Sequence, residues 1–344
     1  MSDIKWKHKR FEDSDTEGVL KLREAVFNEP EYDFSRWSWQ YKANPMGESF
    51  IDLAVDKEDS SKLAGHYAVI SYQMNIEAKI SHVAQSLDTF TSGDYRRQGI
   101  FVALAEKTYE NSLNNGVEYI FGFPNESSYP GFVKKLKFID PFGFDLYKLP
   151  LKLGYFTSKI PGGNLLGGFK LKSSKCPDGQ TSEEIKEVPK GYEELYSSFK
   201  GIAKNHIDRD AAYLKWRYFD CPDRKYKLFK ISLNGKLEAL VVFGLDEENS
   251  YIHLVDLIFS KKENLSSIVD HAVYLASSEP YNSMSIYLNE SNILCSILEG
   301  KGFKHVTKKD SFRFILRNLN EDEYSSEVKD PNNWYITGGD TDFY

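Results

Sequence analysis

The 344-residue sequence predicts an α/β protein made of two related units in tandem. The pattern W-x-Y-x-x-x-P occurs twice, at 39–45 and at 216–222. An Asn-Glu-Ser element that leads to a phenylalanine also occurs twice, at 125–138 and at 289–303. Between these anchors each half has two apolar strands joined by a Lys-Leu turn. Such self-similarity in a constant order indicates a repeated structural unit.

The segment 83–113 carries the clearest chemical signal of the first unit. An apolar strand over 83–91 leads into a polar loop, and residues 96–101 then open a helix that we expect to extend to Leu113. Gly99 lets the backbone approach a ligand closely, because it has no Cβ atom. The amides of a first helical turn and the helix dipole attract anions. A pyrophosphate is therefore expected on the backbone amides of Arg97, Gln98, Gly99, Ile100 and Phe101.

This segment, here called the phosphate loop (residues 96–101), does not match two other phosphate-binding patterns. It lacks both the G-x-x-x-x-G-K-[ST] and the G-x-G-x-x-G spacing. It resembles the acyl-coenzyme A loop of the GNAT-type N-acetyltransferases, Arg/Gln-x-x-Gly-x-Gly/Ala. Arg96 and Gly99 occupy the first two defined positions, and Arg97 adds a second charge suited to phosphate. Phe101 stands where the family usually has Gly or Ala, but its backbone amide is retained.

The order of elements after the phosphate loop also resembles this family. A strand over 116–123 is followed by Asn125 and by an amphipathic segment over 132–138. These look like the family's fifth strand, its asparagine and its fourth helix, which ends in Leu-Gly-Phe. Lys137 replaces that glycine here. The resemblance spans roughly residues 80 to 140, and we extend it to residues 1–150.

The resemblance implies an α/β (α+β) fold of two tandem GNAT-like units, each with a mixed, mostly antiparallel central sheet flanked by helices. We expect an acyl-CoA-binding domain at 1–150, a linker at 151–190, a degenerate GNAT-like domain at 191–320 and a tail at 321–344. In the second copy, residues 260–267 contain neither glycine nor arginine. That unit is therefore predicted to have lost coenzyme binding and to wall off the acceptor side of the first unit or to stabilise it.

The linker and the tail are interpreted from their composition. The glycine-rich stretch 161–168 lacks a following Lys-Ser/Thr and is predicted to be a loop. The tail begins acidic, and polar tails are usually frayed. Its aromatic residues within 334–344 instead predict that it docks against the body of the protein.

The coenzyme and catalytic residues are inferred from what the resemblance implies for acetyl transfer. The pantetheine amides and the oxyanion are expected at the backbone of Phe90 and Thr91, where the fourth and fifth strands of the family separate, with Asn125 at that opening. The family often places a tyrosine at the position of Val133 as proton donor, and Tyr129 is the nearest substitute. Candidate general bases are Asp88 and Glu126, whereas His66 and His82 are interpreted as structural.

Composition excludes several classes of function. A net charge of −7 and an isoelectric point of about 5.6 argue against binding to nucleic acid or to an anionic membrane. Three dispersed cysteines predict neither a disulfide framework nor a metal site. The polar start of the sequence is not expected to be a signal peptide, and no apolar run approaches a membrane span. We expect a cytoplasmic protein, and a homodimer is left open.

The sequence therefore predicts an acetyl-CoA-dependent N-acetyltransferase that acts on a primary amine of a small molecule or amino sugar, by direct attack on the thioester. One alternative is an aminoacyl or long-chain acyl transferase, since tandem GNAT-like units occur in both. The aminoacyl version calls for a basic tRNA groove and usually lacks the R-x-x-G loop. The other alternative is a noncatalytic acyl-CoA-binding protein, which the departures at Phe101, Lys137 and Val133 suggest.

Overall fold

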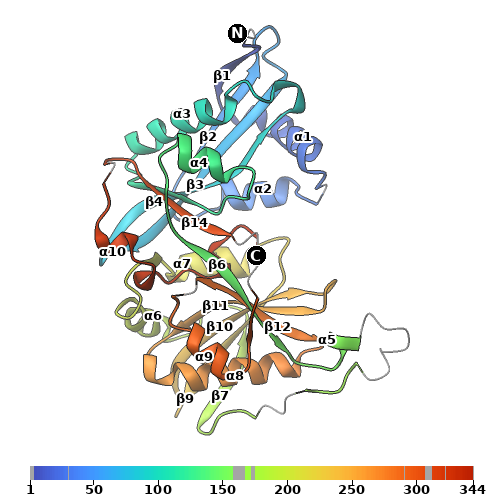
Figure 1. Cartoon of the computed structure of the whole chain (residues 1–344), viewed down its shortest axis with the longest axis vertical. Coiled ribbons are helices and arrows are strands. Elements are labelled where there is room, and N and C mark those ends of the chain that lie inside the picture. Colours follow the sequence, from blue (N-terminus) through green and yellow to red (C-terminus); the bar gives the residue numbers. More distant parts are fainter. Residues whose placement is uncertain are drawn as a thin grey trace. The chain divides into compact units, whose positions relative to one another are not determined.

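The computed structural model describes residues 4–29, 31–157, 167–171, 175–289, 291–306, 312–321 and 323–343 (Figure 1). They form two compact units, and neither unit is continuous in sequence. Unit 1 contains Met1–Phe142, Asp220–Pro222 and Arg313–Lys329, and unit 2 contains Gly143–Phe219, Asp223–Phe312 and Asp330–Tyr344. Most of the predicted glycine-rich loop lies outside the described residues. The predicted domain boundaries at 150, 190 and 320 stay predictions.

Unit 1 is a mixed sheet in the order β1-β2-β3-β4-β5-β14, with helices packed on it. Its strands are rich in apolar and β-branched residues, and Asp33 caps the helix that begins at Phe34 by accepting a hydrogen bond from the N–H of Arg36. Its strands are β1 Trp6–Arg10, β2 Ser49–Asp56, β3 Leu63–Ile76, β4 Lys79–Thr91, β5 Tyr119–Gly122 and β14 Arg313–Asn318. Its helices are α1 Thr16–Phe27, α2 Phe34–Tyr41, α3 Ile100–Asn114, α4 Tyr129–Lys135 and α10 Ser326–Lys329.

Helices cover both faces of the sheet of unit 1. His66 and Tyr67 are neighbours on β3, so their side chains point to opposite faces. The Tyr67 hydroxyl lies 2.5 Å from the hydroxyl of Tyr109 on α3, whereas the ring of His66 packs edge-on against Tyr41 of α2. The apolar core beneath α3 and α4 includes Leu104, Phe132 and the β14 residue Ile315.

Two irregularities of β4 mark the region where the sequence predicted coenzyme contacts. The β3–β4 register shifts between His66 and Ala68, and Asp88 in this bulge has a φ of +46°. The parallel pairing of β4 with β5 ends at Ser86 and Gly122, although β4 continues to Thr91. Strand β5 itself ends at Gly122, so β4 has no pairing with β5 beyond Ser86.

Unit 2 repeats this arrangement with a sheet in the order β6-β12-β11-β10-β9-β7, and β13 pairs with β6. Strand β6, Ile139–Pro150, runs from unit 1 into unit 2. The other strands are β7 Gln180–Ile185, β8 His206–Ile207, β9 Tyr226–Leu233, β10 Lys236–Asp246, β11 Tyr251–Phe259, β12 Ser283–Asn289 and β13 Lys304–Val306. The helices are α5 Gly154–Thr157, α6 Tyr192–Lys200, α7 Ala211–Leu214, which leads into the π-helical turn Lys215–Phe219, α8 Leu265–Ser278 and α9 Cys295–Gly300.

Both copies of the W-x-Y-x-x-x-P pattern make the same contact. Tyr41 donates a hydrogen bond to Asp88 on β4, at 2.9 Å, and Tyr218 donates one to Asp256 on β11, at 3.0 Å. In each unit the strand that carries this aspartate also pairs in parallel with the next strand of the sheet. The predicted fold class of two tandem, related units is thus confirmed, and the repeated tyrosine has a structural reason.

Residues 334–341 of the tail are buried, as predicted from its aromatic residues. Trp334, Tyr335 and Ile336 are at most 4% exposed, and Trp334 forms a bridge with Asn205. Tyr344 lies outside the described residues. The docking prediction is confirmed for this part of the tail.

Candidate active site

The phosphate loop leads directly into α3 and leaves its backbone donors available. Gly99 is the N-cap of α3 with a φ of +78°, and a Cβ atom added there would meet nothing within 4 Å. A helix cannot satisfy the N–H groups of its own first turn. In the described part of the chain, no acceptor receives a hydrogen bond from the backbone N–H groups of Arg97, Gln98, Gly99, Ile100 and Phe101.

Contacts from three strands hold the phosphate loop in place. The Tyr95 hydroxyl donates to Asp56 at the end of β2, at 2.6 Å. The N–H of Ser92 donates to the carbonyl oxygen of Ala64 on β3, at 2.9 Å. The indole N–H of Trp6 on β1 donates to the carbonyl oxygen of Gln98, at 3.2 Å. These anchors, which the sequence analysis missed, come from positions far from the loop and follow no short-range pattern.

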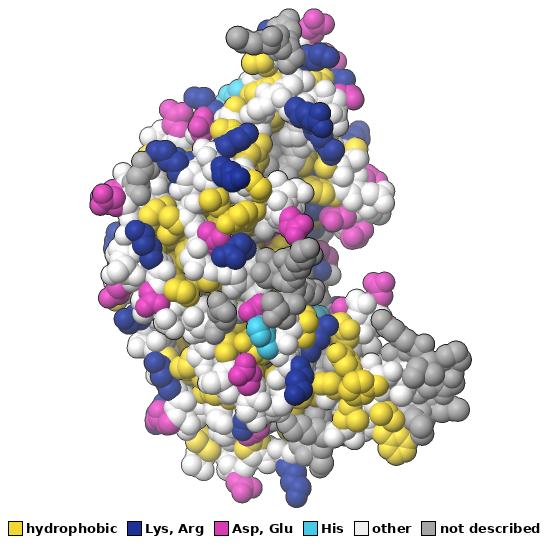
Figure 2. Space-filling model, viewed as in Figure 1, with side chains coloured by type: hydrophobic (Ala, Val, Ile, Leu, Met, Phe, Trp, Pro, Cys, Tyr) yellow, Lys and Arg dark blue, Asp and Glu magenta, His cyan; other side chains and the backbone are white. Residues whose placement is uncertain are grey.

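The charges around the loop suit an anion. Arg96 and Arg97 are exposed, and neither has a carboxylate partner among the residues with described positions. Elsewhere acidic and basic side chains are interspersed on the face in view in Figure 2. Two guanidinium groups beside free amides can therefore neutralise a diphosphate locally, although the whole chain is acidic.

Phe101 does not disturb the loop, because its ring leaves the loop and packs on α4. The ring centroid lies 5.1 Å from that of Phe132 and 5.9 Å from that of Tyr67. Gly131 makes room for it, since a Cβ atom on Gly131 would lie 2.7 Å from the Phe101 ring. The departure from the family pattern is thus matched by a glycine on the facing helix.

Phe90 and Thr91 lie on β4 beyond its last pair with β5. The Phe90 ring is buried and stacks on His66 with a centroid separation of 4.7 Å. Thr91 pairs with Gly65 on the β3 side of the strand. The backbone of both residues therefore belongs to the part of β4 that has no pairing with β5, and their coenzyme role stays a prediction.

Asp88 is held by a polar cluster rather than facing open solvent. Its carboxylate accepts hydrogen bonds from four side chains of α1, of α2 and of the loop between them: Arg23, Tyr32, Gln40 and Tyr41. Burial raises its pKa, but Arg23 and the other donors outweigh burial, so the pKa lies below its usual value. A carboxylate held in this way is a poor proton acceptor, and its assignment as general base stays a prediction.

His66 has a free nitrogen beside the same bulge. Its Nδ1 donates to the carbonyl oxygen of Asp88 at 2.7 Å, so Nε2 is the unprotonated nitrogen of the neutral ring. Nε2 is buried, and it has no hydrogen-bond partner in the described structure. Burial lowers the pKa of His66. The sequence analysis interpreted this histidine as structural because nothing local distinguishes it, yet the fold leaves it an unused acceptor.

The remaining predicted residues lie between β5 and β6. The Tyr129 hydroxyl donates to Asp140, which also accepts from Arg313, and this hydrogen bond raises the pKa of Tyr129. The side-chain oxygen of Asn125 accepts from the N–H groups of Ser127 and Ser128, each at 3.0 Å, and so forms a turn. Glu126 is exposed. The catalytic and coenzyme roles of these residues stay predictions.

No group of three histidine, cysteine, aspartate or glutamate side chains in the described ranges is arranged to hold a metal ion. No described helix combines the length and the apolar character that crossing a membrane requires.

Comparisons with known proteins agree with the geometry. The family model described as an acetyltransferase (GNAT) domain matches residues 7–144. No curated protein matches the chain.

Several solved structures share the fold at low sequence identity. A probable N-acyltransferase of unknown function from Enterococcus faecalis has a TM-score of 0.66 and 12% identity, over 91% of this chain and 73% of its own. A GCN5-related N-acetyltransferase from Anabaena variabilis has the same score and identity, over 92% and 73%. The N-myristoyltransferase of Saccharomyces cerevisiae with bound myristoyl-CoA has a TM-score of 0.60 and 11% identity, over 92% and 83%.

Proposed function

We propose that the protein, whose residues 7–144 match the model of a GNAT acetyltransferase domain, transfers an acetyl group from acetyl-CoA to a primary amine of a small molecule or amino sugar. Acyl transfer from an acyl-CoA is the common activity of this kind of domain. The acidic net charge supports a cationic acceptor, because opposite charges attract at long range.

The observation that carries the proposal is the set of free backbone amides in the phosphate loop. Five consecutive N–H groups, from residue 97 to residue 101, have no acceptor in the described structure. Next to them the space above Gly99 is open, and no carboxylate among the described residues pairs with Arg96. Together these groups would hold the diphosphate of coenzyme A and orient its pantetheine arm along the unpaired part of β4.

The chemistry requires one bond to form and one to break. The acceptor nitrogen attacks the thioester carbonyl carbon, a C–N bond forms and the C–S bond breaks. The nitrogen loses a proton to a base, and the departing thiolate takes one from an acid. We assign the oxyanion contact to the backbone of Phe90 or Thr91, with a value of about 3–4 kcal/mol per donor. Tyr129 is the proposed acid, and Asp88, Glu126 and His66 are the candidates for the base.

The test replaces Gly99 with valine. The new side chain enters the open space above the loop, so we expect Gly99→Val to abolish the thermal shift given by coenzyme A and to remove acetyl-CoA turnover with a panel of amines. Gly116→Val is the matched control, because Gly116 has a similar φ of +83° and equally open surroundings at the other end of α3. Both variants carry the same backbone strain, of about 1–2 kcal/mol. Coenzyme binding that survives in Gly99→Val would remove the phosphate-loop assignment.

Long-chain acyl transfer is the second candidate. The observation that favours it is the fold shared with an N-myristoyltransferase that binds myristoyl-CoA. Turnover of acetyl-, octanoyl- and myristoyl-CoA with the same acceptors separates the two candidates. Coenzyme A binding without turnover of any of them would instead indicate a noncatalytic acyl-CoA-binding protein.

A further inference from the structure

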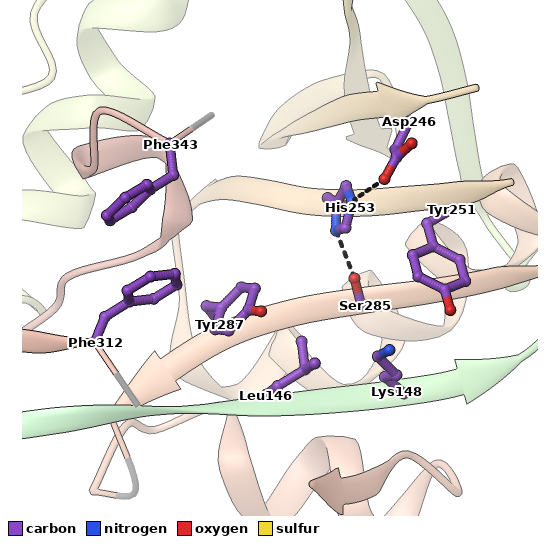
Figure 3. A pocket seen from close by; sticks show the side chains of 9 residues that line it. All are labelled: Leu146, Lys148, Asp246, Tyr251, His253, Ser285, Tyr287, Phe312 and Phe343. Carbon is purple, nitrogen blue, oxygen red and sulfur yellow. Dashed lines mark hydrogen bonds and ion pairs between the residues drawn. The ribbon is translucent and has the colours of Figure 1, made fainter. Parts of the chain in front are cut away.

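Unit 2 contains a cavity of about 290 Å³ on one face of its sheet (Figure 3). Strands β6, β12 and β11 each contribute alternate residues to it, which is how neighbouring strands present side chains on one face. The end of β10, the residue before β14 and the tail complete the lining. The lining residues are Leu146, Lys148, Asp246, Tyr251, His253, Ser285, Tyr287, Phe312 and Phe343.

Lys148 supplies the positive charge of this cavity. Its side chain comes from the C-terminal end of β6 and is half-buried, and its ammonium lies 4.6 Å from the centroid of the Tyr251 ring. No carboxylate pairs with it in the described parts of the chain. The contact with the Tyr251 ring compensates only part of the hydration that this ammonium loses. A bound anion would therefore stabilise it further.

Among the residues that line the cavity, none adds a second positive charge; Lys304, which pairs with Lys148 across β13 and β6, is not part of the lining. His253 Nδ1 lies 2.6 Å from the hydroxyl oxygen of Ser285, and Nε2 lies 3.8 Å from Asp246. Burial lowers the pKa of His253 to about 4, so the ring is neutral at neutral pH. The Asp246 carboxylate is turned to its own hairpin, where it accepts from the backbone and side chain of Asn249. Figure 3 shows Asp246 on the far side of His253 from Lys148.

Ser285 is not a nucleophile in this cluster, although a serine, a histidine and an aspartate occur in a row. Its side chain is fully buried in β12, and it serves to position the His253 ring. The cluster therefore forms the neutral polar floor of the cavity.

Aromatic rings form the other end of the cavity. Phe312 and Phe343 stack with centroids 4.3 Å apart and an interplanar angle of 19°, and Tyr287 packs against Phe312 at 5.3 Å. Figure 3 shows these three rings on the opposite side of Ser285 from Tyr251. These flat rings favour a planar apolar ligand, because contacts between aromatic rings stabilise a complex beyond the burial of apolar surface alone.

We propose that this cavity binds a small aromatic carboxylate, with its carboxylate on Lys148 and its ring against Tyr287, Phe312 and Phe343. One unpaired ammonium matches one negative charge, so a carboxylate fits better than a phosphate dianion. The volume of the cavity lies at the small end of the usual range for binding pockets, so the cavity suits a small ligand. The proposal does not depend on acyl transfer by unit 1, since every lining residue belongs to unit 2.

The experiment titrates the full-length protein with benzoate, phenylacetate and indole-3-acetate by calorimetry, and with the carboxamide of each. The carboxamides keep the ring and remove the charge. We expect at least one acid to bind, and its carboxamide to bind with an affinity lower by about tenfold or more. This is the loss typical of a charge-assisted hydrogen bond. Failure of all three acids to bind at millimolar concentration, or equal binding of acid and amide, overturns the proposal.

Variants then locate the binding. Lys148→Met should lower the affinity for the acid by about tenfold and leave the affinity for its carboxamide unchanged. Lys148→Arg should restore binding of the acid. Lys236→Met, at an exposed lysine of β10 outside the cavity, is the matched control and should bind like the wild type. Circular dichroism and melting curves establish that each variant is folded. Unchanged affinity of folded Lys148→Met for the acid also overturns the proposal.

Discussion

Two residues that depart from the GNAT pattern keep the backbone that the pattern requires. Lys137 has a φ of +57° just after α4, the left-handed conformation that glycine adopts without strain. A lysine there costs about 1–2 kcal/mol but leaves the chain path unchanged. Phe101 keeps its amide at the start of α3 while its ring packs elsewhere. Departures in residue type therefore need not be departures in structure.

Tyr129 is the residue whose proposed role is most directly testable. Its proton is donated to Asp140, so a departing thiolate would compete with that carboxylate for it. We expect Tyr129→Phe to lower kcat by about 100-fold or more, as for other general acids, with unchanged affinity for coenzyme A. Steady-state kinetics and a thermal shift assay measure the two quantities.

The control for this substitution is Tyr119→Phe on β5, because the Tyr119 hydroxyl has no hydrogen-bond partner among the described residues and should not affect turnover. If Tyr129→Phe turns over at the wild-type rate, Tyr129 is not the general acid, and its role is the structural contact with Asp140.

At the scale of elements, helices α3 and α4 fit together through one large and one small residue. The Phe101 ring occupies the space beside Gly131, where a Cβ atom would approach it to 2.7 Å. In the wild type, Gly131→Ala should therefore lower the free energy of unfolding by about 1–3 kcal/mol through overpacking. Urea denaturation monitored by circular dichroism gives this value.

Gly131→Ala should change the free energy of unfolding in the opposite direction once the Phe101 ring is removed. In a Phe101→Ala background, Gly131→Ala should stabilise the protein by up to about 1 kcal/mol, since alanine is the better helix former. Equal effects in both backgrounds would show that the two residues are not coupled.

The ends of elements were predicted less well than their presence. Strand β4 begins at Lys79 rather than at residue 83, because residues 79–82 pair with the end of β3. Strand β5 covers Tyr119–Gly122 rather than 116–123. The polar residues at these ends carry no periodic signal, and their partners on neighbouring elements decide whether they join.

At the scale of the whole molecule, the tail completes unit 2 through a buried charge cluster. Arg209 is fully buried and forms ion pairs with Asp256, at 2.9 Å, and with Asp340 of the tail, at 2.7 Å. Unit 1 has a related arrangement in Arg23 and Asp88, at 3.3 Å. In each unit an arginine thus binds the same aspartate as the repeated tyrosine, from α1 in unit 1 and from the segment between β8 and α7 in unit 2.

Removing the tail carboxylate should destabilise the molecule strongly. We expect Asp340→Ala to lower the free energy of unfolding by about 3–5 kcal/mol, because Arg209 would keep a buried charge with one partner fewer. Denaturation in urea measures the loss. Asp178→Ala, at an exposed position, should change it by less than about 0.5 kcal/mol. Similar values for both variants would mean that the docked tail contributes little.

The sequence by itself determined the tandem fold and the phosphate loop. The phosphate loop rests on short-range information, since a strand, a glycine turn and a helix start lie within about 20 consecutive residues and shape the local backbone directly. The tandem fold rests on short patterns that recur in the same order in both halves of the sequence. The tertiary structure decided the partners of Asp88 and Tyr129, the free nitrogen of His66 and the cavity of unit 2. Those depend on side chains brought together from distant strands, and no local pattern records which distant residue a given side chain will meet.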